Sequence, residues 1–175
     1  MRQPELATEQ VLLARLLSDG GRLGSFISDR AGWLDDNAAD PAARSALLAI
    51  PAEDLLAQRG TLVAKRWRAV LELLPESSFG NPGFCRAIFE DYADRYWPEG
   101  HMRHERDALA FLQFCQSKGI AVSRVEIARL ELRLGLRRFH ILPVRLSRRG
   151  RLRPALLLMH RTGPRSCREH LIASL

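Results

Sequence analysis

The sequence predicts an α+β protein, with a helical N-terminal body followed by a small antiparallel β-unit at the C-terminus. Apolar residues recur at helical spacing through most of the chain before Gly135. Two short apolar runs, residues 139–146 and 155–159, then flank the polar connector SRRGRLR, a pattern typical of a β-hairpin. We therefore expect a helical domain over residues 1–135 and a basic, hairpin-containing domain over residues 136–175.

The first half of the chain predicts four helices. Leucines at helical spacing predict one over residues 4–17, and the sequence Asp19-Gly20-Gly21 is expected to end it. A short helix and an acidic surface loop, LDDNAAD, are expected next. The remaining two are predicted over residues 42–49, capped by Asp40, and over residues 53–74, with a weak point at Gly60.

Three more helices are predicted before the hairpin, over residues 82–97, 104–115 and 122–134. The first carries an aromatic stripe, whose most frequent role is core packing. Within the hairpin, Pro143 must occupy an edge, a bulge or a break, because proline cannot donate to a strand ladder. Residues 166–175 are compatible with either a third strand or a short helix.

Length and cysteine content point to a cytoplasmic protein that folds without disulfides. A chain of 175 residues can bury a core of its own. Its three cysteines are widely spaced and odd in number, which is not a disulfide framework. No apolar run approaches the roughly 20 residues that a membrane span needs, and the N-terminus does not resemble a secretory signal.

Positive charge is concentrated at the C-terminal end. Residues 1–131 carry 16 basic and 19 acidic side chains, whereas residues 132–175 carry 11 arginines and a single acid, Glu169. Such asymmetry indicates an anionic partner, which can be nucleic acid, an acidic protein or peptide, or a membrane surface.

Motifs for catalysis are weak. His101 and His104 could supply two metal ligands, but no further His or Cys motif completes the set, and a polar helix entry explains them better. Cys85 and Cys115 lie among apolar neighbours, where cysteine is usually a small core residue. Phosphate-binding glycine loops and nucleophile elbows are absent from the sequence. We therefore expect no catalytic residues, no metal and no cofactor in this chain.

Two binding functions remain. Residues 107–134 can be interpreted as a helix–turn–helix, which together with the arginine-rich tail makes a DNA-binding regulator an alternative. Glu126 and Glu131 in its second helix would repel phosphates. Alternatively, an edge strand of the hairpin can accept an extended acidic peptide by strand addition, beside residues 139–146 or 155–159.

The order of motifs in residues 66–134 resembles a known family. A Leu74-Pro75 turn comes first and is followed by an aromatic helix with Phe84, Phe89 and Tyr92. A second helical motif contains Asp107, Ala108, Phe111 and Phe114, and a third contains Glu126, Ala128, Leu130 and Glu131. This order is similar to that of the HvfC/BufC-type partner proteins of multinuclear, peptide-modifying iron enzymes. The chain length and the short β-unit resemble the methanobactin-biosynthesis subunits of the MbnC type most.

The resemblance implies an accessory subunit that forms a heterodimer with a barrel-fold iron enzyme and helps to bind the leader of a ribosomal precursor peptide. The partner enzyme would hold the iron and convert a cysteine to an oxazolone with a neighbouring thioamide. The candidate peptide-binding residues are Phe139, Leu142, Val144, Arg145, Leu146, Arg148, Arg153, Leu156 and Leu158. Candidate contacts with the enzyme are Tyr92, Tyr96 and Trp97.

Overall fold

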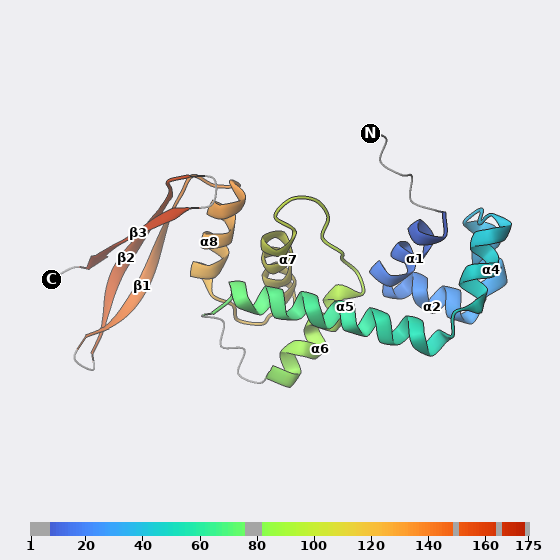
Figure 1. The fold of residues 1–175 in the computed structure, drawn as a ribbon. Coiled ribbons are helices and arrows are strands. Elements are labelled where there is room, and N and C mark those ends of the chain that lie inside the picture. The colour runs from blue at the N-terminus through green and yellow to red at the C-terminus, as the bar shows by residue number, and fades with distance from the viewer. Residues whose placement is uncertain (1–7, 76–81, 149–150, 164–165, 174–175) are drawn as a thin grey trace. The chain divides into compact units, whose positions relative to one another are not determined.

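The computed structural model describes residues 8–75, 82–148, 151–163 and 166–173, which form eight helices and one three-stranded antiparallel sheet (Figure 1). The predicted fold class, an α+β chain with a helical body, is confirmed. These residues divide into two compact units. The first unit contains residues 8–68 and 82–97, and the second contains residues 69–75 and 98–173.

The first unit is entirely helical. Its helices are α1 (Thr8–Ser18), α2 (Gly20–Ser28), α3 (Arg30–Asp36), α4 (Pro41–Ala49), most of α5 (Ala52–Leu73) and α6 (Pro82–Ala93). Three aspartates begin α2, α3 and α4, because the carboxylates of Asp19, Asp29 and Asp40 accept hydrogen bonds from backbone N–H groups of the first turns.

These caps correct two expectations. The sequence Asp19-Gly20-Gly21 does end α1, but it also begins α2, since Asp19 accepts a hydrogen bond from the N–H of Arg22 at 3.0 Å. The expected acidic loop begins later than predicted, because Leu34–Asp36 form the last turn of α3 and Leu34 is fully buried. Helix α4 and its cap are as predicted.

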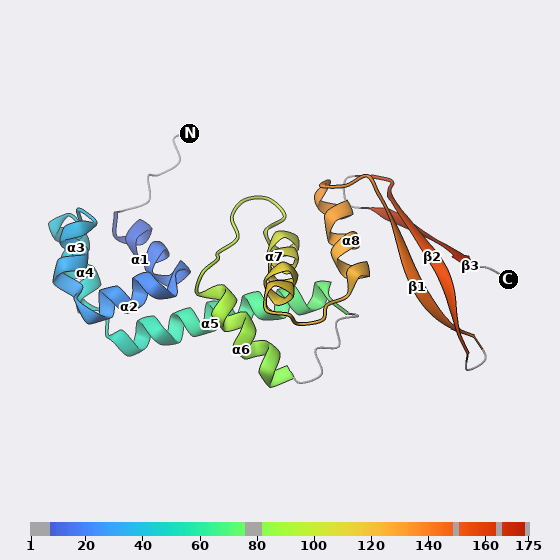
Figure 2. The ribbon, with the colours of Figure 1, turned by 180° about the vertical axis from the view of Figure 1, so that it is seen from behind.

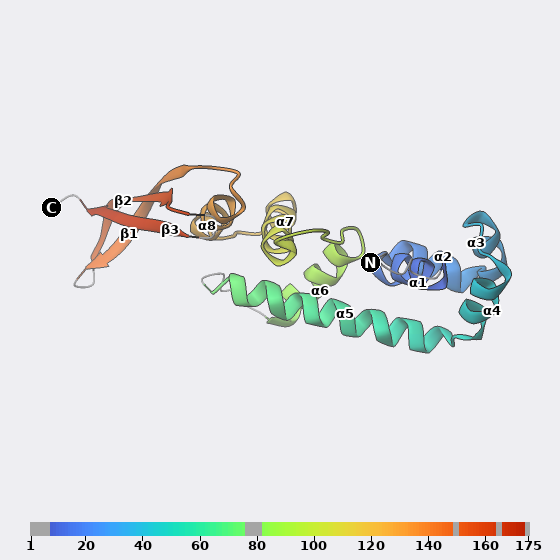
Figure 3. The same cartoon turned by 45° about the horizontal axis from the view of Figure 1, so that its top comes forward.

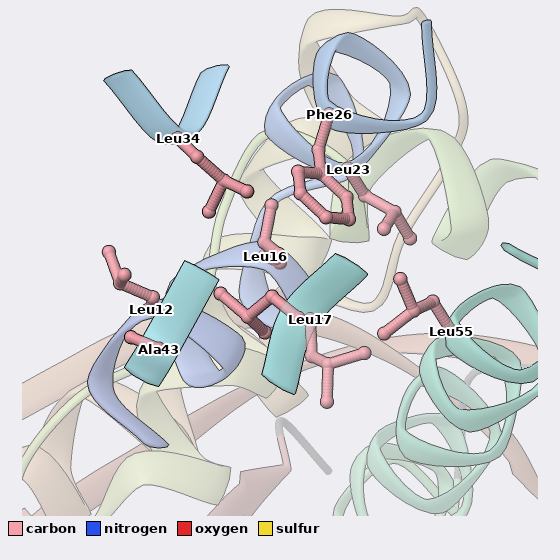
Figure 4. Close-up of a cluster of buried hydrophobic side chains, with 9 residues drawn as sticks. Leu12, Leu16, Leu17, Leu23, Phe26, Leu34, Ala43 and Leu55 are labelled. Atoms are coloured by element: carbon pink, nitrogen blue, oxygen red, sulfur yellow. The ribbon is translucent and has the colours of Figure 1, made fainter. Parts of the chain in front are cut away.

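Leucines, Phe26 and Ala43 form one core cluster of the first unit. Figure 4 shows side chains from α1, α2, α3, α4 and α5 pointing toward one another. Phe26 is fully buried in this cluster, with an edge-on contact to Trp33 at 5.4 Å between ring centroids. Packing of these apolar side chains explains why the four short helices α1 to α4 are stable, since isolated helices of this length are marginal in water.

Helices α5 and α6 differ from the prediction in one respect each. Gly60 does not interrupt α5, because a single glycine costs only about 1 kcal/mol in a helix and packing of Leu55, Val63 and Val70 offsets it. Helix α6 ends at Ala93 rather than at Trp97.

The second unit combines α7 (Arg103–Ser117) and α8 (Arg124–Leu134) with the strands β1 (Phe139–Arg148), β2 (Arg151–Arg161) and β3 (Cys167–Ala173). Helix α8 lies between α7 and the sheet, as Figure 1, Figure 2 and Figure 3 agree. Its ends are set by Ser123, whose hydroxyl accepts from the N–H of Glu126, and by Gly135, whose left-handed φ of 74° suits glycine.

The two units do not coincide with the domain boundary expected at residue 135. Helix α8 buries Ala128 and Leu132 against Leu142, Leu157 and Met159 of the sheet. A three-stranded sheet cannot bury an apolar face by itself, so the helices that cover it belong to the same unit.

Among the residues that the structure describes, no helix is both long enough and apolar enough to cross a membrane.

Candidate peptide-binding sheet

The register of the sheet defines its two faces. The strand order is β1-β2-β3, with both pairs antiparallel, so β2 is central and β1 and β3 are the edges. Side chains alternate between faces along each strand. The face that packs on α8, here called the inner face, includes Leu142, Leu157 and Met159. The opposite outer face is formed by alternate residues from Phe139 to Arg145, from Leu152 to His160 and from Arg168 to Ile172.

Two hydrogen bonds fix which backbone groups remain unpaired. The N–H of Arg161 donates to the carbonyl of Arg138 at 3.0 Å, so even-numbered residues of β1 bond to β2. The N–H of Thr162 donates to the carbonyl of Ser166 at 3.0 Å, so even-numbered residues of β3 bond to β2. Odd-numbered residues of both edge strands therefore direct their N–H and C=O groups outward.

The two prolines of the sheet fit this pattern. Pro143 is one of the odd-numbered residues of β1, so the N–H that proline lacks would have pointed to the outer edge of the sheet. Pro154 lies in the central strand, outside the described ladder with β3, which runs from Ala155 to Arg161 of β2. Pro143 therefore settles at an edge, one of the three positions expected for it, and it interrupts the row of outward donors on β1.

The edge of β3 is uninterrupted. Cys167, Glu169 and Leu171 each present an outward N–H and C=O, with no proline between them. Strand β3 was one of two possibilities for this segment, and alternation in CREHLIA is too weak to select it from the sequence. The peptide edge that the sequence placed beside residues 155–159 is wrong, because β2 is paired on both sides there.

The structure places the candidate peptide-binding residues on different faces. Phe139, Arg145, Leu156 and Leu158 belong to the outer face. Leu142 and Val144 pack on the inner face against α8, so neither side chain can contact a peptide on the open face. Arg153 is exposed near the end of the hairpin. The side chains of Leu146 and Arg148 lie outside the described residues.

The candidate enzyme contacts surround an arginine. The guanidinium of Arg66 lies 4.4 Å from the ring centroid of Trp97 and 5.8 Å from that of Tyr92, and it donates to the carbonyl of Tyr96 at 3.1 Å. Tyr92 is buried and Trp97 half-buried, so both stabilise the first unit, Tyr92 as a core residue. Only Tyr96, 40% exposed, offers a substantial ring surface to a partner.

An ion pair ties α8 to the edge strand β3. The guanidinium of Arg129 donates from Nε and Nη2 to the two carboxylate oxygens of Glu169, at 2.5 and 2.9 Å. This bidentate hydrogen bond, together with the charges of Arg129 and Arg133, lowers the pKa of Glu169 from its ordinary value, although partial burial opposes the shift.

Acid should weaken this tie. Because the pKa of Glu169 is lower in the folded chain, its stabilisation is present at neutral pH and is lost as the pH falls through that value, below about 4.5. We expect Glu169→Gln to cost about 0.5–1 kcal/mol at pH 7 and less at pH 3, since the pair is partly exposed. Urea unfolding followed by circular dichroism at both pH values tests this, and an equal cost at both would contradict it.

The remaining candidates for chemistry do not form a centre. His101 precedes α7, and Met102 between it and the helix has a left-handed φ of 57°, so His101 and His104 do not share one helical face. No group of three or more potential metal ligands occurs in the described part of the chain. Cys85 and Cys115 are buried thiols, and burial raises the pKa of Cys85.

Comparisons with known proteins add no relative: no protein-family model, no curated protein and no solved structure matched the chain.

Proposed function

We propose that this chain is a cytoplasmic, non-catalytic partner subunit that binds a barrel-fold iron enzyme and the leader of a ribosomal precursor peptide. In this role it supports oxidative cysteine modification to an oxazolone and a thioamide, as in methanobactin-type biosynthesis. The iron belongs to the partner enzyme. The motif resemblance in residues 66–134 suggests the system, and the observation that carries the proposal is the edge of β3 that pairs with no other described strand.

An extended peptide can add to β3 as a fourth strand. The outward N–H and C=O groups of Cys167, Glu169 and Leu171 supply a regular ladder, which gives affinity without regard to sequence. Such edges are normally protected by charge, proline or a covering segment. Strand β1 has Pro143 in this role, whereas no described residue of β3 is a proline.

Positive charge near β3 favours an acidic peptide. The charge of Arg133 of α8 acts on Glu169, and Arg168 is exposed on β3 itself. Arg145 and Arg153 add exposed charge on β1 and β2. Because Glu169 is already paired with Arg129, it opposes an approaching carboxylate less than an isolated acid would. The charges set orientation and association rate, and the ladder sets the register.

Charge reversal tests the peptide half of the proposal. In a variant with Arg145, Arg153 and Arg168 all changed to Glu, we expect retention of the acidic leader peptide to fall at least about tenfold, because three attractions become repulsions. Binding is measured by fluorescence anisotropy of a labelled leader peptide, taken from the precursor whose gene lies beside that of the partner enzyme. The matched control reverses Arg15, Arg68 and Arg106, which are exposed residues of the helices α1, α5 and α7. Equal losses in both variants would indicate a nonspecific charge effect and contradict the proposal.

Co-expression with the neighbouring iron enzyme tests the other half. We expect the two chains to purify together, with Tyr96 the side chain most available for that contact. A precursor peptide modified only when both chains are present would support the accessory role.

The alternative, a DNA-binding regulator, has less support. Helix α8, the second helix of the helix–turn–helix interpretation, is covered by the sheet and buries Glu126, Ala128, Leu130 and Leu132. Its Arg129 is occupied by Glu169 rather than directed toward a groove.

A further inference from the structure

The outer face of the sheet is rich in apolar residues although it is exposed. Its apolar residues include Phe139, Ile141, Leu152, Leu156 and Ile172, which are between 45% and 67% exposed. A sheet face of this kind is normally buried against a helix or a second sheet. Helix α8 covers the inner face in this way, and no described residue covers the outer one.

The apolar residues form one continuous patch. Register places Pro143, Leu156 and Ile172 side by side across all three strands, and Ile141 beside Leu158 in the next row. Where β3 ends, a pocket of about 460 Å³ is lined by Pro143, Pro154, Leu156 and Ile172 among others, with Arg145 at its border. A contiguous patch of this type usually marks an interaction site, and the pocket suits an aliphatic side chain.

All charge on this face has one sign. Arg145 and Arg168 stand at opposite ends of the patch, and the rings of His160 and His170 stack at 5.3 Å beside Arg168. The described residues of the outer face include no carboxylate. Two copies of the chain would therefore oppose arginine to arginine if they paired through this face. An occupant that complements it carries apolar residues bordered by acids.

We infer that the outer face docks an acidic amphipathic helix of a partner protein. The partner helix would cover the outer face in the way that α8 covers the inner face. Its apolar stripe would lie on the patch, and its carboxylates would lie near Arg145 and Arg168. Nucleic acid fits less well, because stacking on bases needs aromatic platforms and most of this patch is aliphatic. The inference does not depend on peptide addition at β3, because the ladder there uses backbone groups of the edge, whereas the helix uses apolar side chains of the face; the two share only the charges of Arg145 and Arg168.

The test uses the full chain and a synthetic probe. The probe is a helix of about 18 residues, roughly 27 Å long, with leucines on one side and glutamates along both borders. A second peptide has lysine in place of every glutamate. We expect the acidic helix to bind at least about tenfold more tightly than the basic one. In heteronuclear NMR spectra, the shifted amides should be those of outer-face residues such as Ile141 and Leu156.

Two variants remove the patch in different ways. Changing Ile141 and Leu156 to Glu should weaken binding of the acidic helix at least about tenfold, through lost apolar contact and added repulsion. Changing both to Thr removes apolar area but keeps β-propensity, so it guards against a folding defect and should weaken binding by a smaller factor. Leu48→Glu, an exposed leucine of α4, is the matched control and should change nothing.

Several outcomes would overturn the inference. One is equal affinity for the acidic and basic helices, and another is unchanged binding in the Ile141→Glu, Leu156→Glu variant. Self-association that this variant abolishes would identify a second copy as the occupant. Binding to vesicles of anionic phosphatidylglycerol, without binding to the acidic helix, would identify a membrane surface instead.

Discussion

Replacing Leu171 with proline is expected to weaken binding of the leader peptide at least about tenfold, whereas Ile141→Pro is expected to leave binding intact. Both residues have odd parity on an edge strand, so their N–H groups point outward and take no part in the ladder with β2. Proline at either position therefore removes a donor that only an added strand would use. The two variants differ in which edge they block.

The size of the effect follows from the ladder. A single lost backbone hydrogen bond costs about 0.5–1.5 kcal/mol, and the proline ring also prevents close approach of the added strand. We expect the affinity of the peptide to fall at least about tenfold, or about 1.4 kcal/mol, in Leu171→Pro. Pro143 already occupies a position equivalent to Ile141 on β1, so a second proline there should be tolerated.

The pair of variants separates three cases. Loss only in Leu171→Pro supports addition to β3. Loss only in Ile141→Pro would place the peptide on β1, in spite of Pro143. Unchanged binding in both variants would contradict strand addition altogether, and the arginines would then have to act without a backbone ladder. As a control, circular dichroism spectra should show that each variant retains its secondary structure.

The helices and the hairpin were predictable because their signals are local. Asp40-Pro41 begins α4, Ser123 begins α8, and the apolar runs around residues 139–146 and 155–159 gave both hairpin strands, which in the structure are longer. The prediction was less precise where local signals compete. Asp19-Gly20-Gly21 is compatible both with the end of one helix and with the beginning of the next. The Gly60 weak point disappears because packing decides it, not propensity.

The surface of the sheet could not be predicted in the same way. Leu142 and Leu156 have the same residue type in adjacent strands, yet one is buried under α8 and the other is exposed. Tertiary packing determines which face of the sheet α8 covers, and a shift of one residue in register would exchange the two faces. The open edge of β3 depends on that same register, since parity determines which backbone groups remain unpaired.

The second large effect concerns stability, and it should be confined to one unit. Leu132→Ala removes a fully buried side chain from between α8 and the sheet, where Leu142, Leu157 and Met159 pack. Such truncations cost about 2–5 kcal/mol. All three tryptophans, Trp33, Trp67 and Trp97, belong to the first unit, so their fluorescence reports on that unit, whereas circular dichroism reports on both.

In urea titrations of Leu132→Ala, part of the circular dichroism transition should therefore move to lower denaturant while the tryptophan transition stays near its original midpoint. Phe26→Ala, which truncates a fully buried side chain of the first unit, should do the opposite, with a cost of about 3–5 kcal/mol at the tryptophan signal. Leu136→Ala, at an exposed position just after α8, serves as the control and should move neither. If Leu132→Ala shifted both signals equally, the two units would unfold as one cooperative body. Peptide binding should follow the second unit alone, because the edge of β3 depends on α8 holding the sheet in place.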